Sequence, residues 1–209
     1  MFPNGLLMLA VKWCKLLIVD CGSGTLVMES EGRLMSMLTG YAAAHQHPFN
    51  IVVHMIGIPT IMLGVLIPLT WIGFEIGEFR ILFAHVLLIG FVLFYLTPDV
   101  VFAVIFGIGA YLLSLLAIKL GAYPGNSGWI IAAACFFGGY AAQFIGHAVE
   151  KSVPVLVKHP IQANLAAPFF TVVELVKLAG LRDDLFNAVQ EQVKRQRDSS
   201  EMDSDGESA

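Results

Sequence analysis

Four long apolar runs dominate the chain and limit what it can fold into. They are Ile51–Ile72, Ile81–Leu96, Val100–Lys119 and Trp129–Val149. A helix needs about 20 residues to cross the hydrocarbon core of a bilayer, so three runs are long enough and the second, which is slightly short, can borrow flanking residues. The pattern therefore predicts an all-α fold, a polytopic membrane helix bundle of about four transmembrane helices with flanking amphipathic helices.

The composition supports a membrane protein. The 209 residues are 57% hydrophobic and 13% charged, whereas an average soluble domain is roughly 25% charged. So few charges could not cover the surface of a soluble protein of this size. The net charge is -4 and no basic stripe exists, which argues against a nucleic-acid partner. The three cysteines form neither a CxxC pair nor a zinc spacing.

The chain divides into three predicted regions. Residues 1–29 form an N-terminal extension, residues 30–196 the membrane helical domain, and residues 197–209 a disordered acidic tail rich in Ser, Asp and Glu. Near the end of the domain, Ile161–Leu178 is apolar but contains several polar residues. We expect an interfacial or partly inserted helix there, with a fifth span as the alternative. A short amphipathic helix follows around residues 185–193.

The distribution of charges and small residues predicts the topology and one helix contact. Lysines and arginines lie before the first run and after the fourth, so the positive-inside rule places both termini in the cytoplasm. Trp71 and Trp129 then fall together at the opposite interface. A stripe of small residues in the fourth run is expected to pack closely against another helix. The stripe consists of Ala134, Gly138, Ala142 and Gly146.

Histidines are the candidate functional residues. The chain contains His45, His47, His54, His85, His147 and His159. Ionisable residues inside a membrane are costly and usually functional. Four spans return the chain to its starting face, so His54 and His147 are expected near the same cytoplasmic face, with His159 just beyond. His85 falls nearer the opposite face, where an interhelical hydrogen bond explains it better than a metal.

One helix face carries Gln143, His147 and Glu150, at i, i+4 and i+7. A ligand histidine usually needs a hydrogen-bond acceptor to fix its tautomer. Gln143 or Glu150 could supply it, or Glu150 could itself be a ligand. Imidazole-rich sites suit iron, copper, zinc or nickel. The spacing leaves both a metal site and buried polar packing open.

Two motifs resemble those of a known family. The first is Tyr41-x3-His45-x2-Pro48-x-Asn50-x3-His54. The second is Gln143-Phe-Ile-Gly-His147-Ala-Val-Glu150, followed by Pro154, Gln162 and Ala167-Pro-Phe-Phe-Thr-Val-Val-Glu174. Together they resemble the membrane-embedded 2-hydroxy fatty acid dioxygenases, an iron-dependent family that shortens 2-hydroxy acyl chains by one carbon. In fungi that family acts in phytosphingosine breakdown at the endoplasmic reticulum. The likeness runs from about Leu34 to Val193.

The resemblance implies a catalytic site and its substrates. Fe(II) would be held by His45, His54 and His147, with a fourth ligand from His159 or Glu150. The substrates would be O₂ and a long-chain 2-hydroxy fatty acid whose acyl chain lies among the helices in the lipid bilayer. The products would be CO₂ and the acid one carbon shorter. The expected location is the endoplasmic reticulum membrane, or the plasma membrane of a bacterium.

Two other function classes compete with this reading. A non-enzymatic multi-pass membrane protein could bind a lipid or a metal ion through the same histidines. A histidine-box desaturase or hydroxylase fits less well, because the paired HxxHH-type boxes are missing.

Overall fold

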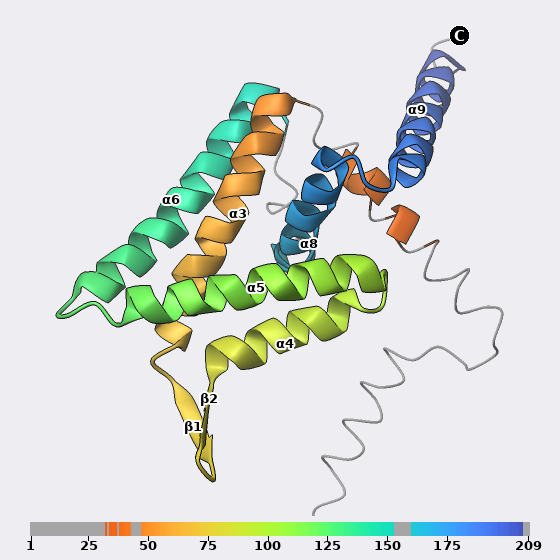
Figure 1. Ribbon diagram of the computed structural model, residues 1–209. Coiled ribbons are helices and arrows are strands. Elements are labelled where there is room, and N and C mark those ends of the chain that lie inside the picture. Colours follow the sequence, from red (N-terminus) through yellow and green to blue (C-terminus); the bar gives the residue numbers. More distant parts are fainter. Residues whose placement is uncertain (1–31, 33, 37, 43–46, 153–159, 207–209) are drawn as a thin grey trace, which may run out of the picture.

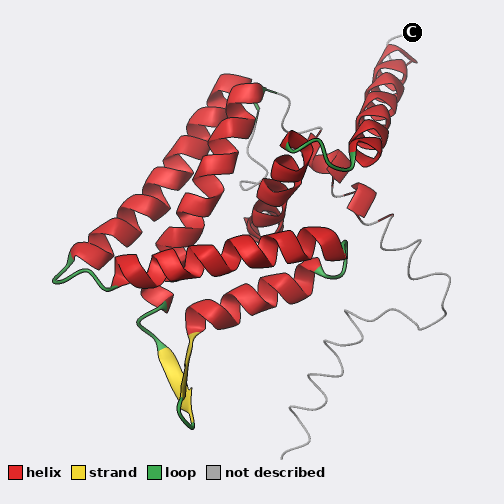
Figure 2. Ribbon diagram, viewed as in Figure 1, coloured by secondary structure: helices red, strands yellow, loops and turns green. Residues whose placement is uncertain are grey.

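The computed structural model describes residues 32, 34–36, 38–42, 47–152 and 160–206 (Figure 1). Its labelled elements are α3 (Pro48–Leu69), β1 (Gly73–Ile76), β2 (Phe79–Leu82), α4 (Phe83–Tyr95), α5 (Val100–Gly121), α6 (Ser127–Glu150), α8 (Pro160–Leu178) and α9 (Asp183–Gly206). Figure 2 shows that the described part is mostly helical, with one two-stranded hairpin. The predicted helical class is confirmed.

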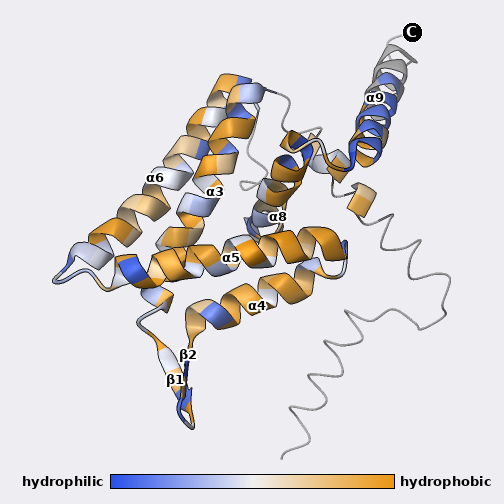
Figure 3. Cartoon of the chain, in the orientation of Figure 1, coloured by the Kyte–Doolittle hydropathy of each residue, from blue (hydrophilic) through white to orange (hydrophobic). Residues whose placement is uncertain are grey.

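Three helices are long and apolar enough to cross a membrane. They are α3 and α5, of 22 residues each, and α6, of 24 residues. The helices α8 and α9 pass the same test only as a pair, Ala163–Leu178 with Asp183–Arg195, bent by 115°. The residues that the structure describes therefore contain three to four candidate spans. In Figure 3 the apolar colour covers most of α4 and α5, whereas α9 is largely hydrophilic.

The second apolar run differs from expectation. Its helix α4 has 13 residues, about 20 Å of helix at 1.5 Å per residue against a hydrocarbon core of about 30 Å. The helix cannot begin earlier in the chain, because the preceding residues, Phe79–Leu82, form strand β2. The sequence allowed this run to borrow flanking residues and span the membrane, and the 13-residue helix α4 is too short to do so alone.

Helices α3 and α6 form the most extensive contact, an antiparallel pair (Figure 1). Glycines allow the two backbones to approach. A Cβ atom on Gly64 would lie 2.6 Å from the backbone nitrogen of Phe136, and one on Gly139 would lie 3.0 Å from the carbonyl oxygen of Gly57. Such close approach without side chains between the backbones is typical of helix pairs in membranes.

The expected small-residue stripe was partly wrong. Gly146 does face α3, but Ala134 and Gly138 are exposed, and no described residue outside its own stretch of helix lies within 4 Å of a Cβ atom built on Gly138. The packing face instead uses Gly139. A spacing of four drifts around a helix with 3.6 residues per turn, and α6 carries small residues on adjacent faces, so the spacing alone could not select the packed one.

Helices α4 and α5 form an antiparallel hairpin that packs against α8 through aromatic rings. The Tyr95 hydroxyl donates to the carbonyl oxygen of Leu165, 2.7 Å away. At the turn between α4 and α5, Asp99 accepts the backbone N–H of Phe102 and thereby caps α5. The same carboxylate pairs with Arg182 at 2.6 Å. This ion pair joins the α4–α5 turn to the α8–α9 turn.

The other end of the α3–α6 pair is closed by tryptophans. The rings of Trp71 and Trp129 have centroids 4.4 Å apart, and the indole N–H of Trp71 donates to the carbonyl oxygen of Gly121 at 2.9 Å. The end of α3, the end of α5 and the start of α6 therefore meet here. The two tryptophans lie together, as the sequence predicted.

At the C-terminus, α9 continues to Gly206. Its backbone is thus helical beyond residue 197, where the sequence predicted a disordered tail. The domain boundaries at 29–30 and 196–197 stay predictions, and residues 1–29 lie outside the described part of the chain.

Candidate functional site

Polar side chains gather where α3 begins and α6 ends. Helix α3 starts at Pro48, whose missing N–H costs nothing in the first turn, and the ring of His47 accepts the N–H of Phe49 at 3.2 Å. Helix α6 ends at Glu150, and the next residue, Lys151, has a left-handed backbone with φ of 58°. That turn brings the N–H of Ser152 back to the carbonyl oxygen of His147, 3.0 Å away.

His54 and His147 meet in this region. Both are buried, and their rings stand edge to face with centroids 4.9 Å apart and planes at 89°. The Nδ1 atom of His54 lies 3.0 Å from the carbonyl oxygen of Asn50. Because a carbonyl can only accept, Nδ1 carries the hydrogen in the neutral ring and Nε2 carries the lone pair. The structure brings together these two predicted site residues.

Ser152 fixes the second ring. The Nδ1 atom of His147 lies 2.8 Å from the hydroxyl oxygen of Ser152, which donates to Glu150 at 3.3 Å. The sequence had suggested Gln143 or Glu150 as the group beside this ring. Gln143 instead lies beside Gly57, where a Cβ atom would come within 3.3 Å of its side chain. The hydroxyl of Ser152 lies between the His147 ring and Glu150 and bonds to both.

Glu150 joins the two helices. One carboxylate oxygen accepts the backbone N–H of His47 at 2.9 Å, and the other accepts the side-chain amide of Asn50 and the hydroxyl of Ser152. Its negative charge also lies at the start of α3, where it interacts favourably with the positive end of the helix dipole. Glu150 therefore holds the start of α3 against the end of α6.

Asn50, like Ser152, has a role in this cluster that the sequence did not reveal. It is 0% exposed, its backbone carbonyl orients His54, and its side chain binds Glu150. Its Oδ1 atom has no hydrogen-bond partner among the described residues, and a Cβ atom at Gly146 would collide with it. The sequence signal that could have indicated this role was an asparagine in the first turn of an apolar helix, four residues before a histidine.

Two further motif residues lie near this cluster. The ring of Tyr41 stacks on Phe170, with centroids 3.7 Å apart and planes at 14°. Burial raises the pKa of the Tyr41 hydroxyl, and the carboxylates of Glu174 and Glu150 raise it further. Glu174 is itself buried on α8, 3.6 Å from the ammonium of Lys177. Tyr41 and Glu174, which the sequence placed only in motifs, therefore border the site.

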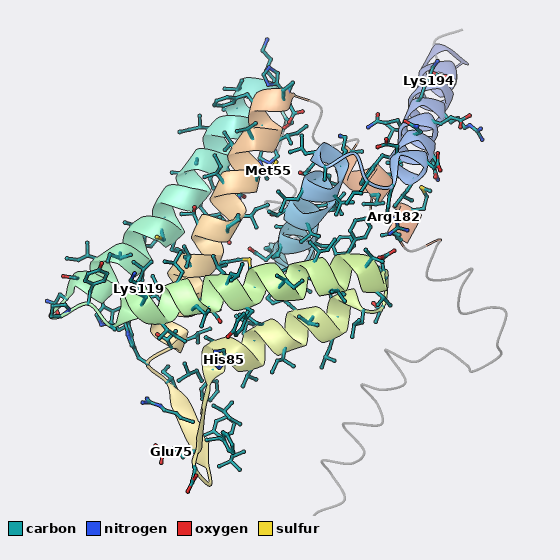
Figure 4. All side chains as sticks on the ribbon, in the orientation of Figure 1. Met55, Glu75, His85, Lys119, Arg182 and Lys194 are labelled. Carbon is teal, nitrogen blue, oxygen red and sulfur yellow. The ribbon has the colours of Figure 1, made fainter. Side chains whose placement is uncertain are left out.

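The remaining histidines fall into two groups. His45 and His159 lie outside the described residues. His85 lies at the start of α4 beside the β-hairpin, at the far end of α3 from His54 (Figure 4). It therefore takes no part in the His54–His147 cluster.

The donor set fits a transition metal in part. Within the described ranges, no three His, Cys, Asp or Glu side chains form a group that could hold a metal ion. Two buried imidazoles do meet, and in the neutral ring of His54 the lone pair is on Nε2, because Nδ1 donates to the carbonyl oxygen of Asn50. Neutral imidazole is a good ligand for iron. His54 and His147 are thus the two histidines of the predicted ligand set that the described part of the chain brings together.

Comparison with known protein families identifies the family of this chain. The family model described as "2-hydroxy-palmitic acid dioxygenase Mpo1-like" matches residues 33–178. The chain belongs to the Mpo1-like family. The match includes both motifs, so Asn50, His54, His147 and Glu150 all lie inside it. Searches of curated proteins and of solved structures each gave no match.

Membership in the Mpo1-like family settles two open alternatives. The chain is an enzyme of the dioxygenase class rather than a non-enzymatic lipid or metal binder, and it is not a desaturase. The family implies a 2-hydroxy fatty acid and O₂ as substrates, and a dioxygenase of this kind suggests a metal cofactor. With its long apolar helices, the chain is a multi-pass membrane enzyme of lipid metabolism.

Proposed function

We propose that this enzyme is an iron(II)-dependent dioxygenase acting on long-chain 2-hydroxy fatty acids. One substrate molecule and one O₂ would give the fatty acid one carbon shorter, one CO₂ and one water, which balances all atoms. The observation that carries the proposal is the buried edge-to-face pair of His54 and His147 inside the family match.

His54, His147 and His45 would hold the iron through neutral imidazoles, with His159 or Glu150 as the fourth ligand. Glu150 already accepts three donors, which favours a positioning role for it and leaves His159 as the better fourth ligand. When bound, Fe(II) supplies the activation of O₂ that this chemistry needs.

The chain's own residues would bind and orient the substrate. A site of neutral imidazoles keeps most of the metal's positive charge, which attracts the carboxylate and the 2-hydroxyl group of the substrate. The hydroxyl of Tyr41, which its surroundings keep protonated, is a neutral donor at the border of the site. The apolar surfaces of the helices would hold the acyl chain away from water.

The enzyme would lie in the endoplasmic reticulum membrane, or the plasma membrane of a bacterium, with both termini in the cytoplasm. The charge distribution supports this orientation. The ion pair between Arg182 and Asp99 supports it too, because it holds the α8–α9 turn at the α4–α5 turn, away from the tryptophan end.

Oxygen uptake by the purified enzyme tests the proposal. Detergent-purified protein, supplied with Fe(II) and 2-hydroxypalmitic acid, is expected to consume one O₂ for each odd-chain acid released, as measured by an oxygen electrode and mass spectrometry. Palmitic acid, which lacks the 2-hydroxyl group, is the matched control and is expected to give no uptake. A product that retains every substrate carbon would refute the proposal.

A further inference from the structure

The β1–β2 hairpin has one apolar face and one charged face. Its strands pair Phe74 with Ile81, Glu75 with Arg80, and Ile76 with Phe79. Residues directly opposite one another share a face, and successive residues alternate between faces. Phe74, Ile76, Phe79 and Ile81 therefore form an apolar face, and Glu75 and Arg80 lie on the other face.

The apolar face is not covered by the helices. Phe79 is 78% exposed, Ile76 is 59% exposed and Phe74 is 44% exposed. Figure 4 shows the hairpin projecting from the helices. Glu75 lies on one side of its ribbon, and most of the hairpin's apolar side chains lie on the other. Exposed apolar groups of this kind mark a surface that contacts something other than water.

The position of the hairpin indicates what covers it. It begins two residues after Trp71, at the end of the bundle where Trp71 packs on Trp129. Tryptophan is enriched at the boundary between hydrocarbon and headgroups. Three long apolar helices also begin or end here, so this end of the bundle marks one membrane boundary.

The apolar face continues onto α4. The ring of Phe74 contacts that of Phe83, the first residue of α4, with centroids 6.1 Å apart. Along α4, large apolar side chains face outward at Phe83, Val86, Leu87, Ile89 and Leu93. The hairpin face is therefore contiguous with a helix surface of the kind that faces lipid.

The backbone limits how deep the hairpin can lie. A two-stranded sheet leaves unpaired N–H and C=O groups along both outer edges, and the hydrocarbon core cannot satisfy them. Glu75 and Arg80 on the charged face would be costly there as well. The headgroup region meets both demands, because it offers hydrogen-bonding groups and admits apolar side chains to about 5–10 Å.

We propose that the β1–β2 hairpin lies in the interfacial layer of the lipid bilayer, with Phe74, Ile76, Phe79 and Ile81 toward the acyl chains and Glu75 and Arg80 toward water. The hairpin would then anchor the short helix α4, which cannot reach across the membrane alone.

Site-directed fluorescence in phosphatidylcholine nanodiscs tests this placement. In a background with Cys14, Cys21 and Cys135 replaced, a single cysteine at Phe79 or Ile76 carries an environment-sensitive dye. The matched controls carry it at Glu75 or Arg80 on the opposite face. A phospholipid with a nitroxide near the headgroup end of its acyl chain is expected to quench the first pair severalfold more than the controls. Circular dichroism verifies that each labelled variant keeps its helix content.

Two outcomes would overturn the proposal. Equal quenching at both faces would mean that the hairpin does not lie flat on the bilayer. Weak quenching at both positions of the apolar face, together with cross-linking between Phe79→Cys copies in separate chains, would show that a second copy covers this face instead.

Discussion

The imidazole of His54 stands edge to face with that of His147, with centroids 4.9 Å apart, although each ring belongs to a different helix. Each ring is oriented by a group of its own segment, the carbonyl of Asn50 for the first and the hydroxyl of Ser152 for the second. The distance between the rings is set by the close packing of α3 on α6. The site therefore depends on both local hydrogen bonds and helix packing.

Replacing either ring is expected to remove the metal. Loss of one imidazole from a site with three or four ligands abolishes tight binding, whereas an interhelical hydrogen bond is worth only about 0.6–2 kcal/mol. His54→Ala and His147→Ala should therefore lose iron and oxygen uptake while still inserting and folding. Metal analysis of detergent-purified protein measures this. His85→Ala is the control and should keep both, and its failure to do so would contradict the assignment of His85 to packing.

Gly146→Ala is expected to destabilise the protein. The new Cβ atom would collide with Oδ1 of Asn50, and such overpacking typically costs about 1–3 kcal/mol. Gly138→Ala is the matched control, because no described residue outside its own stretch of helix lies within 4 Å of its Cβ position. Thermal unfolding in detergent compares the two. Adding Asn50→Ala to Gly146→Ala should cost less than the sum of the single changes, and strict additivity would rule out the collision.

The sequence predicted the meeting of His54 and His147 from a count of four crossings, but α4 is too short to complete one by itself. The two histidines meet nevertheless, because the α4–α5 hairpin returns the chain to Trp71 whatever the depth that α4 reaches. An apolar run shows that a segment is buried in lipid or protein. It does not show where a strand replaces the first turn of a helix.

Other features could not be predicted because they depend on tertiary contacts. Ser152 looked like an ordinary loop residue, and only the left-handed turn at Lys151 returns it to His147. Asn50 was visible as a motif letter, but its bond to Glu150 crosses between two helices. Motifs thus located the site, while the residues that orient its histidines needed the packed structure.

Both chain ends are expected in the same, cytoplasmic compartment. Positive charge at both ends of the membrane domain and the two tryptophans at the far boundary motivate this. Protease protection of tags before residue 30 and after Arg182 tests it, with both tags expected to be digested from the cytoplasmic side. Tags on opposite faces would make the bent pair Ala163–Leu178 and Asp183–Arg195 a further span.

Stability is expected to fall at alkaline pH through Tyr41. Burial, Glu174 and Glu150 raise the pKa of its hydroxyl above the ordinary value of about 10. The folded protein then keeps a proton that the unfolded chain releases, so the contribution is complete below about pH 10 and declines above it. Unfolding of wild type and Tyr41→Phe, which keeps the ring stack, is compared at about pH 9 and about pH 11. The wild type should lose more stability on this rise, and equal losses would exclude Tyr41.

Glu150 can act on the metal site in two ways that differ in outcome. The structure connects it to His147 through Ser152 and gives its two oxygens three donors, so we expect an indirect role. Loss of a group that orients a ligand costs about 10–100-fold in metal affinity or activity. Glu150→Gln should therefore leave a weakened but measurable enzyme, and a direct carboxylate ligand replaced by an amide should lose far more.

The variant Ser152→Ala helps to distinguish an indirect role of Glu150 from direct binding to the metal. It keeps the Glu150 carboxylate but removes the hydroxyl between it and His147, so iron affinity should fall to a similar degree as in Glu150→Gln. Thr60→Ala is the control, because the bond of that hydroxyl among the described residues is to the carbonyl oxygen of Ile56 within α3. Iron titration of the three variants distinguishes the cases. If Glu150→Gln lost all binding while Ser152→Ala kept wild-type affinity, Glu150 would be a direct ligand. Unchanged affinity in both would remove this hydrogen-bonded chain from the metal site.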